Sequence, residues 1–80
     1  MNLEILTPEK TLFIGTVESV TLPGTQGMFT VLTNHAPMIS SLRPGEITYA
    51  QKEKRETLSI GEGFVEVRNN NITVCTQNAK

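Results

Sequence analysis

The sequence predicts an all-β fold, and three observations carry that prediction. Apolar residues alternate with polar ones at a period of two along most of the chain. Glycine, proline and asparagine interrupt these runs at short intervals, as they do in turns between strands. Only residues 50–57 have a helix-forming composition, and a charged hairpin tip fits them better because they lack an apolar face and a cap. Many short strands with frequent turns indicate a sandwich or a barrel.

Most expected strands are marked by two apolar residues that are two positions apart. In chain order the pairs are Leu3 and Ile5, Val20 and Leu22, Phe29 and Val31, Ile47 and Tyr49, Leu58 and Ile60, Val65 and Val67, and Ile72 and Val74. Val17 lies three positions before Val20 and is out of phase with it. A bulge near residues 18–19 or a strand break at Gly15 would reconcile the two.

The turn residues are specific enough to predict local geometry. Pro23-Gly24 and Pro44-Gly45 fit the two central positions of type II turns, because proline fixes φ at the first and glycine accepts a positive φ at the second. Residues 68–71 can supply left-handed residues between the last two strands, since asparagine tolerates φ > 0. These signals divide the chain into strands, but they do not determine the order of the strands.

Length and charge exclude several classes of function. Eighty residues make one small domain, which we expect to span residues 1–80 as a single sandwich. The net charge of -1 leaves no basic stripe for phosphates, so no nucleic-acid partner is expected. Apolar runs are far too short for a transmembrane span, so no direct membrane insertion is expected. A single cysteine, Cys75, favours the cytosolic side of a membrane and is interpreted as a small apolar strand residue.

The residue types needed for catalysis do not occur together. His35 is the only histidine and the chain has no aspartate, so a Ser-His-Asp triad cannot form. One histidine and one cysteine forty positions apart do not make a metal site. Residues 24–27 are rich in glycine but lack the lysine of a phosphate-binding loop. We therefore expect no catalytic residue, no metal and no cofactor.

His35 lies in the most unusual segment of the chain, residues 27–39. A strand-like run there meets Thr33-Asn34-His35 and is then bent by Ala36-Pro37, because the residue before proline is pushed towards extended geometry. Asn34 and His35 either hydrogen-bond the backbone of this loop or present His35 to a partner surface, and both interpretations can hold together.

Several motifs, collinear over most of the chain, resemble the epsilon subunit of the F-type ATP synthase. The resemblance is carried by residues 3–10, by Phe13-Ile14-Gly15 with residues 17–20, by Leu22-Pro23-Gly24 and Gly27, by Asn34-His35-Ala36-Pro37, by residues 42–47, and by residues 61–67 with 71–74. Each motif alone is weak, but their shared order and spacing are highly specific.

The resemblance implies a β-sandwich of two five-stranded sheets and a non-catalytic role in the central stalk. On that basis the chain binds the gamma subunit of F1, contacts the c-ring of Fo, and couples ion flow to ATP synthesis in the complete proton-translocating F1Fo complex. It is expected to lie peripherally on the cytoplasmic face of the bacterial inner membrane. Family members commonly continue into a C-terminal helical hairpin, which we do not expect here.

Two further departures from the family pattern concern the expected partner contacts. Thr33 stands where a proline is common, and Met28 stands where members often carry a polar or acidic residue, so an apolar contact replaces a charged one. The expected contact residues for the gamma subunit or the c-ring are Met28, Thr33, Asn34, His35, Met38 and Ser40.

Three alternatives remain open at this stage. Met28, Met38 and Ile39 could be ordinary core residues rather than parts of an apolar contact patch. The chain could be a stand-alone binding module, although its four aromatic residues leave few to spare for a ligand surface. It could also be a small enzyme built around His35 and a glutamate, which would require a cleft and a carboxylate beside the imidazole.

Overall fold

The strands follow the alternating pattern, and the computed structural model describes residues 1–77 of the chain. The expected domain spans residues 1–80, and its last three residues, 78–80, lie outside the described residues. Within residues 1–77 there is no helix long and apolar enough to cross a membrane. The strands are β1 (Asn2–Leu6), β2 (Thr11–Thr16), β3 (Ser19–Gly24), β4 (Gly27–Leu32), β5 (Met38–Leu42), β6 (Gly45–Gln51), β7 (Lys54–Ile60), β8 (Gly63–Arg68) and β9 (Asn71–Thr76).

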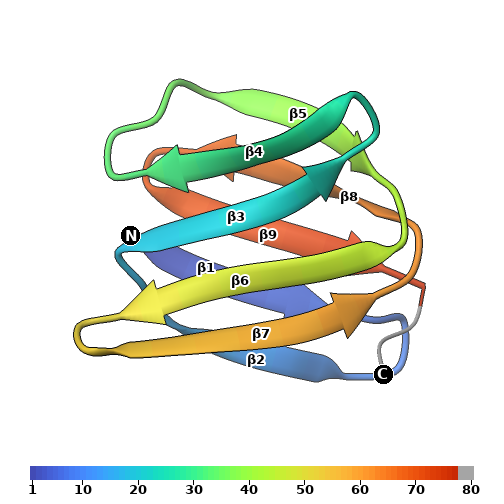
Figure 1. Ribbon diagram of the computed structural model, residues 1–80, viewed down its shortest axis with the longest axis horizontal. Coiled ribbons are helices and arrows are strands. Elements are labelled where there is room, and N and C mark those ends of the chain that lie inside the picture. The colour runs from blue at the N-terminus through green and yellow to red at the C-terminus, as the bar shows by residue number, and fades with distance from the viewer. Residues whose placement is uncertain (78–80) are drawn as a thin grey trace.

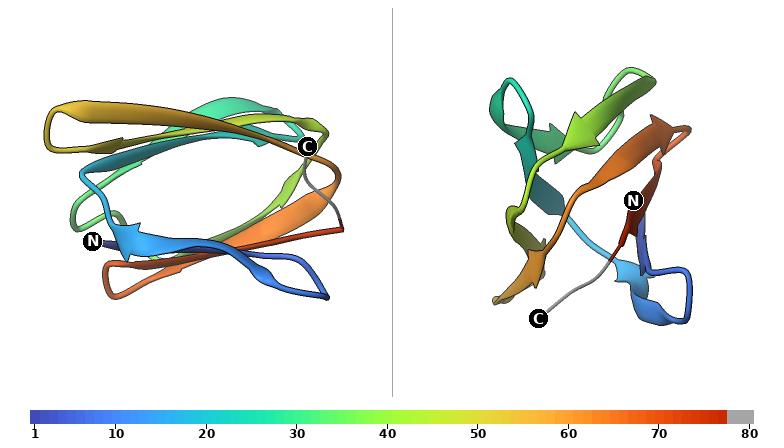
Figure 2. Two further views of the ribbon diagram at one scale, coloured as in Figure 1. Left: turned by 90° about the horizontal axis from the view of Figure 1, so that it is seen from below. Right: turned by 90° about the vertical axis from the view of Figure 1, so that its right-hand side faces the viewer.

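These strands form two layers that face each other across the core (Figures 1 and 2). The five-stranded layer has the order β2-β1-β9-β8-β5, and the four-stranded layer has the order β4-β3-β6-β7. The β5 strand pairs with β8 along its length and meets β3 only through Leu42 and Gly24. The predicted sandwich is therefore confirmed. Five strands per layer are reached only if the end of β5 is counted with both layers.

The phase change between Val17 and Val20 marks a crossing from one layer to the other. The backbone N–H of Val17 donates to the carbonyl of Met1, the residue before β1 of the five-stranded layer, at 2.8 Å. The N–H of Glu18 donates to the carbonyl of Ala50, in β6 of the four-stranded layer, also at 2.8 Å. Gly15 remains within β2. The predicted bulge at 18–19 and the predicted break at Gly15 are thus replaced by a corner at residues 17–18.

Both predictions of type II turns at Pro-Gly pairs are wrong. Gly24 pairs with Gly27 and with Leu42, so β3 continues through it and the turn comes at residues 25–26. Gly45 already pairs with Ile60 at the start of β6. Among the described glycines only Gly27 has a positive φ, 135°. In both cases sheet pairing keeps the glycine extended.

The other two turn predictions are confirmed. Asn69 and Asn70 have φ values of 52° and 61° and join β8 to β9. The charged segment forms a hairpin tip, and β6 and β7 extend so far along it that only residues 52–53 remain outside them. An ion pair between Lys54 and Glu56, at 3.3 Å, lies on the exposed edge of this hairpin.

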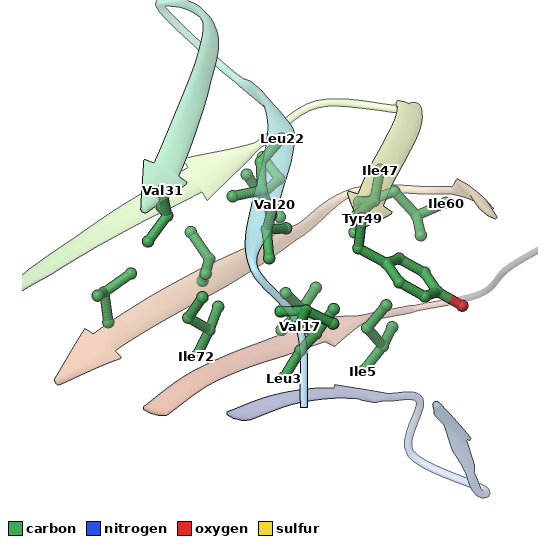
Figure 3. Close-up of a cluster of buried hydrophobic side chains, with 14 residues drawn as sticks. Leu3, Ile5, Val17, Val20, Leu22, Val31, Ile47, Tyr49, Ile60 and Ile72 are labelled. Carbon is green, nitrogen blue, oxygen red and sulfur yellow. The ribbon is translucent and has the colours of Figure 1, made fainter. Parts of the chain in front are cut away.

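The core lies between the layers, and apolar side chains from both point towards it (Figure 3). At one open side of the sandwich, the Phe13 ring of β2 lies against the Tyr49 ring of β6, with centroids 4.3 Å apart and planes tilted by 39°. Most members of the predicted apolar pairs are buried, whereas Phe29 and Leu58 are only partly so. The buried core residues are Leu3, Ile5, Val17, Val20, Leu22, Val31, Leu42, Ile47, Tyr49, Ile60, Val65, Val67, Ile72 and Val74.

Candidate partner-binding site

Within residues 1–77, five large apolar side chains are exposed, and the strands place them in two groups. Ile14, Ile39 and Phe64 are 69%, 75% and 50% exposed and belong to β2, β5 and β8 of the five-stranded layer. Met28 and Leu32 are 58% and 57% exposed and both belong to β4, at the edge of the four-stranded layer. Exposed apolar side chains that gather on one surface indicate a binding site more strongly than scattered ones do.

The outer face of the five-stranded layer carries a mainly apolar row at one end. Strand register places Cys75 beside both Leu6 and Phe64, and the alternation turns all three away from the buried Val65 and Val74. These residues, with Pro8 from the β1–β2 turn, help to line a hollow of about 480 Å³, which we call the outer-face hollow. Its full lining is Leu6, Thr7, Pro8, Glu62, Gly63, Phe64, Cys75, Thr76 and Gln77.

A second row on the same face carries two carboxylates. Thr73 is paired with Glu4 on one side and with Glu66 on the other. Exposed isoleucines end the row, since Ile14 pairs with Glu4 and Ile39 pairs with Glu66. A partner that covers this acidic row would need apolar groups at its edges and basic groups at its centre.

The expected contact residues Met28, Met38 and Ser40 gather where the β3–β4 hairpin approaches β5. They line a groove of about 540 Å³ between the β3–β4 hairpin and β5, formed by residues 24–29 and 38–41, which we call the β4–β5 groove. Met38 is half-buried and packs against the core, whereas Met28 and Ile39 are exposed. The core interpretation is therefore correct for Met38 and wrong for Met28 and Ile39.

The other three expected contact residues, Thr33, Asn34 and His35, lie on the connection between β4 and β5. The N–H of His35 donates to the Leu32 carbonyl at 3.1 Å, and its Nδ1 donates to the Ala36 carbonyl at 2.7 Å. The interpretation that Asn34 and His35 hydrogen-bond the backbone of this loop is thus confirmed for His35 and wrong for Asn34, whose side chain bonds to Asn70. Partner contact by these three residues stays a prediction.

Asn34 is held from another part of the chain. Its backbone N–H donates to Oδ1 of Asn70 at 2.7 Å, and Nδ2 of Asn70 donates to Oδ1 of Asn34 at 3.0 Å. Both residues have a positive φ, 68° and 61°, which asparagine adopts more readily than most residues. This reciprocal pair, which we call the amide clasp, ties the β4–β5 connection to the β8–β9 turn.

Sequence reasoning missed the outer-face hollow, although a signal for it was present. Phe64 and Cys75 alternate with the buried Val65 and Val74, so each occupies the phase that normally carries polar residues. The structure confirms Cys75 as a half-buried residue of β9. Apolar residues in the solvent-facing phase of a strand are the pattern that would have identified this surface.

Side chains that could bind a metal ion or transfer a proton do not cluster on the part of the surface that the structure describes. Within residues 1–77 no three His, Cys, Asp or Glu side chains come close enough to hold a metal ion. The Nδ1 atom of His35 meets the backbone carbonyl of Ala36 and not the carboxylate that a Ser-His-Asp triad would place there. Both hollows are lined mainly by uncharged residues, which fits contact with another macromolecule.

Comparison with known sequences yields one family and close relatives. The family model described as ATP synthase, Delta/Epsilon chain, beta-sandwich domain matches residues 1–80. The chain is 43% identical over 79 residues to an ATP synthase epsilon chain of Magnetococcus marinus, covering 99% of this chain and 58% of the relative. It is 37% identical over 76 residues to one of Leptospira borgpetersenii, covering 95% and 60%. The chain thus spans about three fifths of the length of these relatives.

Solved structures share the fold at lower sequence identity. A chain of the mitochondrial ATP synthase of Euglena gracilis, in an assembly of OSCP, F1 and c-ring, superposes with a TM-score of 0.90 at 21% identity, over 98% of this chain and 51% of that one. A chain from the central stalk and c-ring of the Tetrahymena thermophila enzyme superposes with a TM-score of 0.82 at 16% identity, over 99% and 64%. At these identities the likeness concerns the fold.

Proposed function

The chain belongs to the family of ATP synthase delta and epsilon chains through their beta-sandwich domain, and from this we propose that it is a non-catalytic subunit of the central stalk. In this role it binds the gamma subunit of F1, contacts the c-ring of Fo, and helps to couple ion flow through the proton-translocating complex to ATP synthesis. It lies peripherally on the cytoplasmic face of the bacterial inner membrane.

The match along the whole of residues 1–80 is the observation that carries this proposal. The two solved structures with the same fold support it, since one is an assembly of F1 with the c-ring and the other an assembly of the central stalk with the c-ring. A sandwich of this size also leaves three large apolar side chains exposed on one outer face. Burying such a face against a second subunit stabilises both proteins.

We assign the gamma contact to the outer face of the five-stranded layer. An apolar anchor from gamma would enter the outer-face hollow beside Phe64, while basic side chains would face Glu4 and Glu66 in the acidic row. Ile14 and Ile39 would close the edges of the contact against water. We assign the c-ring contact to β4, β5 and the connection between them, which carry Met28, Thr33, Asn34, His35, Met38 and Ser40.

Co-expression with the gamma subunit of the same organism tests the first contact. We expect a one-to-one complex on size exclusion at moderate salt, because the buried face supplies an apolar centre. The double variant Phe64→Ser, Ile14→Ser should elute separately from gamma, because both side chains belong to the outer face and neither lines the β4–β5 groove. Met28→Ser, which removes an exposed apolar side chain from β4, should leave the complex intact and instead weaken capture by detergent-solubilised c-ring.

The same experiment separates this proposal from the alternatives. Separate elution of two well-folded wild-type proteins would contradict the stalk assignment and favour a stand-alone binding module. ATP hydrolysis or another turnover by the purified chain alone, abolished by His35→Ala, would favour the small enzyme. Equal gamma binding by both sets of variants would show that the outer face is not the gamma contact.

A further inference from the structure

We propose that the free edge of β4 is a docking site for an extended peptide segment of a partner protein, which adds to the four-stranded layer as a further strand. The inference rests on the backbone groups, charge and surroundings of this edge, and it does not require the assignment to the central stalk.

Strand register shows which backbone groups of β4 are free. Gly24 and Gly27 close the two-residue hairpin turn, so alternation in an antiparallel ladder turns the N–H and C=O groups of Gly27, Phe29 and Val31 towards β3. Those of Met28, Thr30 and Leu32 point away from it. The carbonyl of Pro23, opposite Met28, likewise points away from β4, since it accepts a hydrogen bond from the N–H of Arg43 at 2.9 Å.

One of these outward-pointing backbone groups already has a hydrogen-bond partner within the chain. The Leu32 carbonyl accepts from the N–H of His35 at 3.1 Å. Within residues 1–77 the backbone groups of Met28 and Thr30 have no such partner beyond β3. They therefore form a short row of donors and acceptors of the kind to which an added strand bonds.

This edge carries no charge, proline or bulge, the features within a strand that discourage pairing. All six residues of β4 are uncharged, none is proline, and its register with β3 is unbroken. By contrast, β7 carries Lys54, Arg55 and Glu56, and the pairing of β2 with β1 shifts register between Ile5 and Leu6. Soluble proteins usually place charges, proline or bulges on exposed edge strands. Their absence from β4 therefore indicates that a partner strand covers this edge.

The surroundings of the edge favour a single strand over a second copy of the chain. Figure 1 shows that β5 and residues 33–37 project beyond β4 on this side. A second sandwich that paired edge to edge with β4 would meet these segments. One extended peptide would instead run beside β4 along the β4–β5 groove, where residues 24–29 and 38–41 leave about 540 Å³.

The side chains around the edge define the sequence of the peptide. Its residues that pair with Met28 and Thr30 would share the outer face with them, because directly paired residues point to the same side. A row of threonines crosses that face, formed by Thr30, Thr21, Thr48 and Thr57, so small hydroxyl residues extend it. The intervening peptide residues point inward to Phe29 and Met38 and must be apolar. The partner segment is thus an uncharged alternation of threonine and valine-like residues.

Peptides with N-methylated backbone amides test which N–H groups pair with β4. A capped peptide, Lys-Val-Thr-Val-Thr-Val-Lys, is added to the full chain while amide hydrogen exchange is followed by NMR. We expect exchange at Met28 and Thr30 to slow about tenfold or more. We propose that the peptide runs antiparallel to β4, as β3 does, so its threonine N–H groups face β4 and its valine N–H groups face away. N-methylation of the threonines should therefore abolish protection, and N-methylation of the valines should retain it.

Two substitutions of Thr30 test the same pairing by changing the protein instead of the peptide. Thr30→Pro removes the free N–H and leaves the backbone bonds to β3 in place, and proline is tolerated at such an edge position. It also removes the hydroxyl that is hydrogen-bonded to Thr21 at 2.9 Å, a loss that Thr30→Val shares. Thr30→Pro should weaken peptide binding about tenfold or more, whereas Thr30→Val keeps the N–H and should bind within about twofold of the wild type. If Thr30→Pro does not fold, the two methylated isomers decide alone. Equal binding of both isomers, or no protection at about 1 mM peptide, would overturn the proposal.

Discussion

At the residue scale, the amide clasp makes a prediction with a close control. Asn70→Gly removes the side chain that bonds to Asn34 but still accepts the positive φ, so it should lower the free energy of unfolding by about 1 kcal/mol. Asn69→Gly makes the same change at the neighbouring turn position, where no side-chain bond is lost, and should cost distinctly less. Chemical denaturation of both variants measures the difference. Equal stabilities would show that the clasp contributes nothing.

Tyr49 gives a second prediction at this scale. Burial, and then the nearby carboxylate of Glu56, raise the pKa of the Tyr49 phenol above its usual 10.0. The unfolded chain therefore loses this proton first, so the stabilisation is complete below about pH 10 and is lost as pH rises towards the folded-state pKa. Tyr49→Phe should flatten the fall in stability in this alkaline range.

The chain suits a direct check of this effect because Tyr49 is its only tyrosine. Phenolate absorbance of the folded protein therefore reports this residue alone, and its midpoint should lie above that of the denatured chain. A folded midpoint equal to or below the denatured one would contradict the assigned burial effect.

At the scale of elements, the start of β8 depends on a close approach of two backbones. A methyl group at Gly63 would overlap the carbonyl oxygen of Cys75 and lie 2.9 Å from Cα of Thr76. We expect Gly63→Ala to cost about 3 kcal/mol, because neither backbone can move without breaking the pairing of β8 with β9. Thermal unfolding measures this loss. Glu62→Ala, an exposed neighbour, should change stability by less than about 0.5 kcal/mol.

Individual strands were largely predictable from the sequence. Turns were not predictable where hydrogen-bonded pairing between strands outweighed the turn propensity of the local sequence. The apolar residues Val65 and Val67, which are separated by the polar Glu66, predicted β8 correctly. Pro23-Gly24 has strong turn propensity, yet Gly24 is fixed by partners in two other strands that no local pattern reveals. The amide clasp was equally hidden, because its two residues are 36 positions apart in the chain.

At the scale of the whole molecule, stability depends on the space between the two layers. Leu22 of β3 is fully buried in that space, whereas Leu32 of the adjacent β4 is 57% exposed. Leu22→Ala should therefore lower the free energy of unfolding by about 2 to 5 kcal/mol. The same change at Leu32 should cost less than about 1 kcal/mol. Denaturant midpoints compare the two, and similar losses would contradict the assignment of the core.

The sandwich as a class was predictable, while its topology and its exposed surfaces were only partly so. Alternation reports that each strand has one buried face, but it does not say which strand lies beside which. The parallel pairing of β1 with β9 joins residues about seventy positions apart and leaves no local signal. The outer-face hollow depends on that pairing, because Leu6 and Cys75 meet only through it.

The position of β9 between β1 and β8 sets the order in which this protein can take shape during translation. Until β9 leaves the ribosome, the β1–β2 hairpin has no neighbour across which to extend its layer. Hydrogen bonds that join the two ends of a chain also bring the slow search typical of distant contacts. A nascent chain that stalls before β9 has been made would expose half of an unfinished sheet. Chaperones would have to protect such chains.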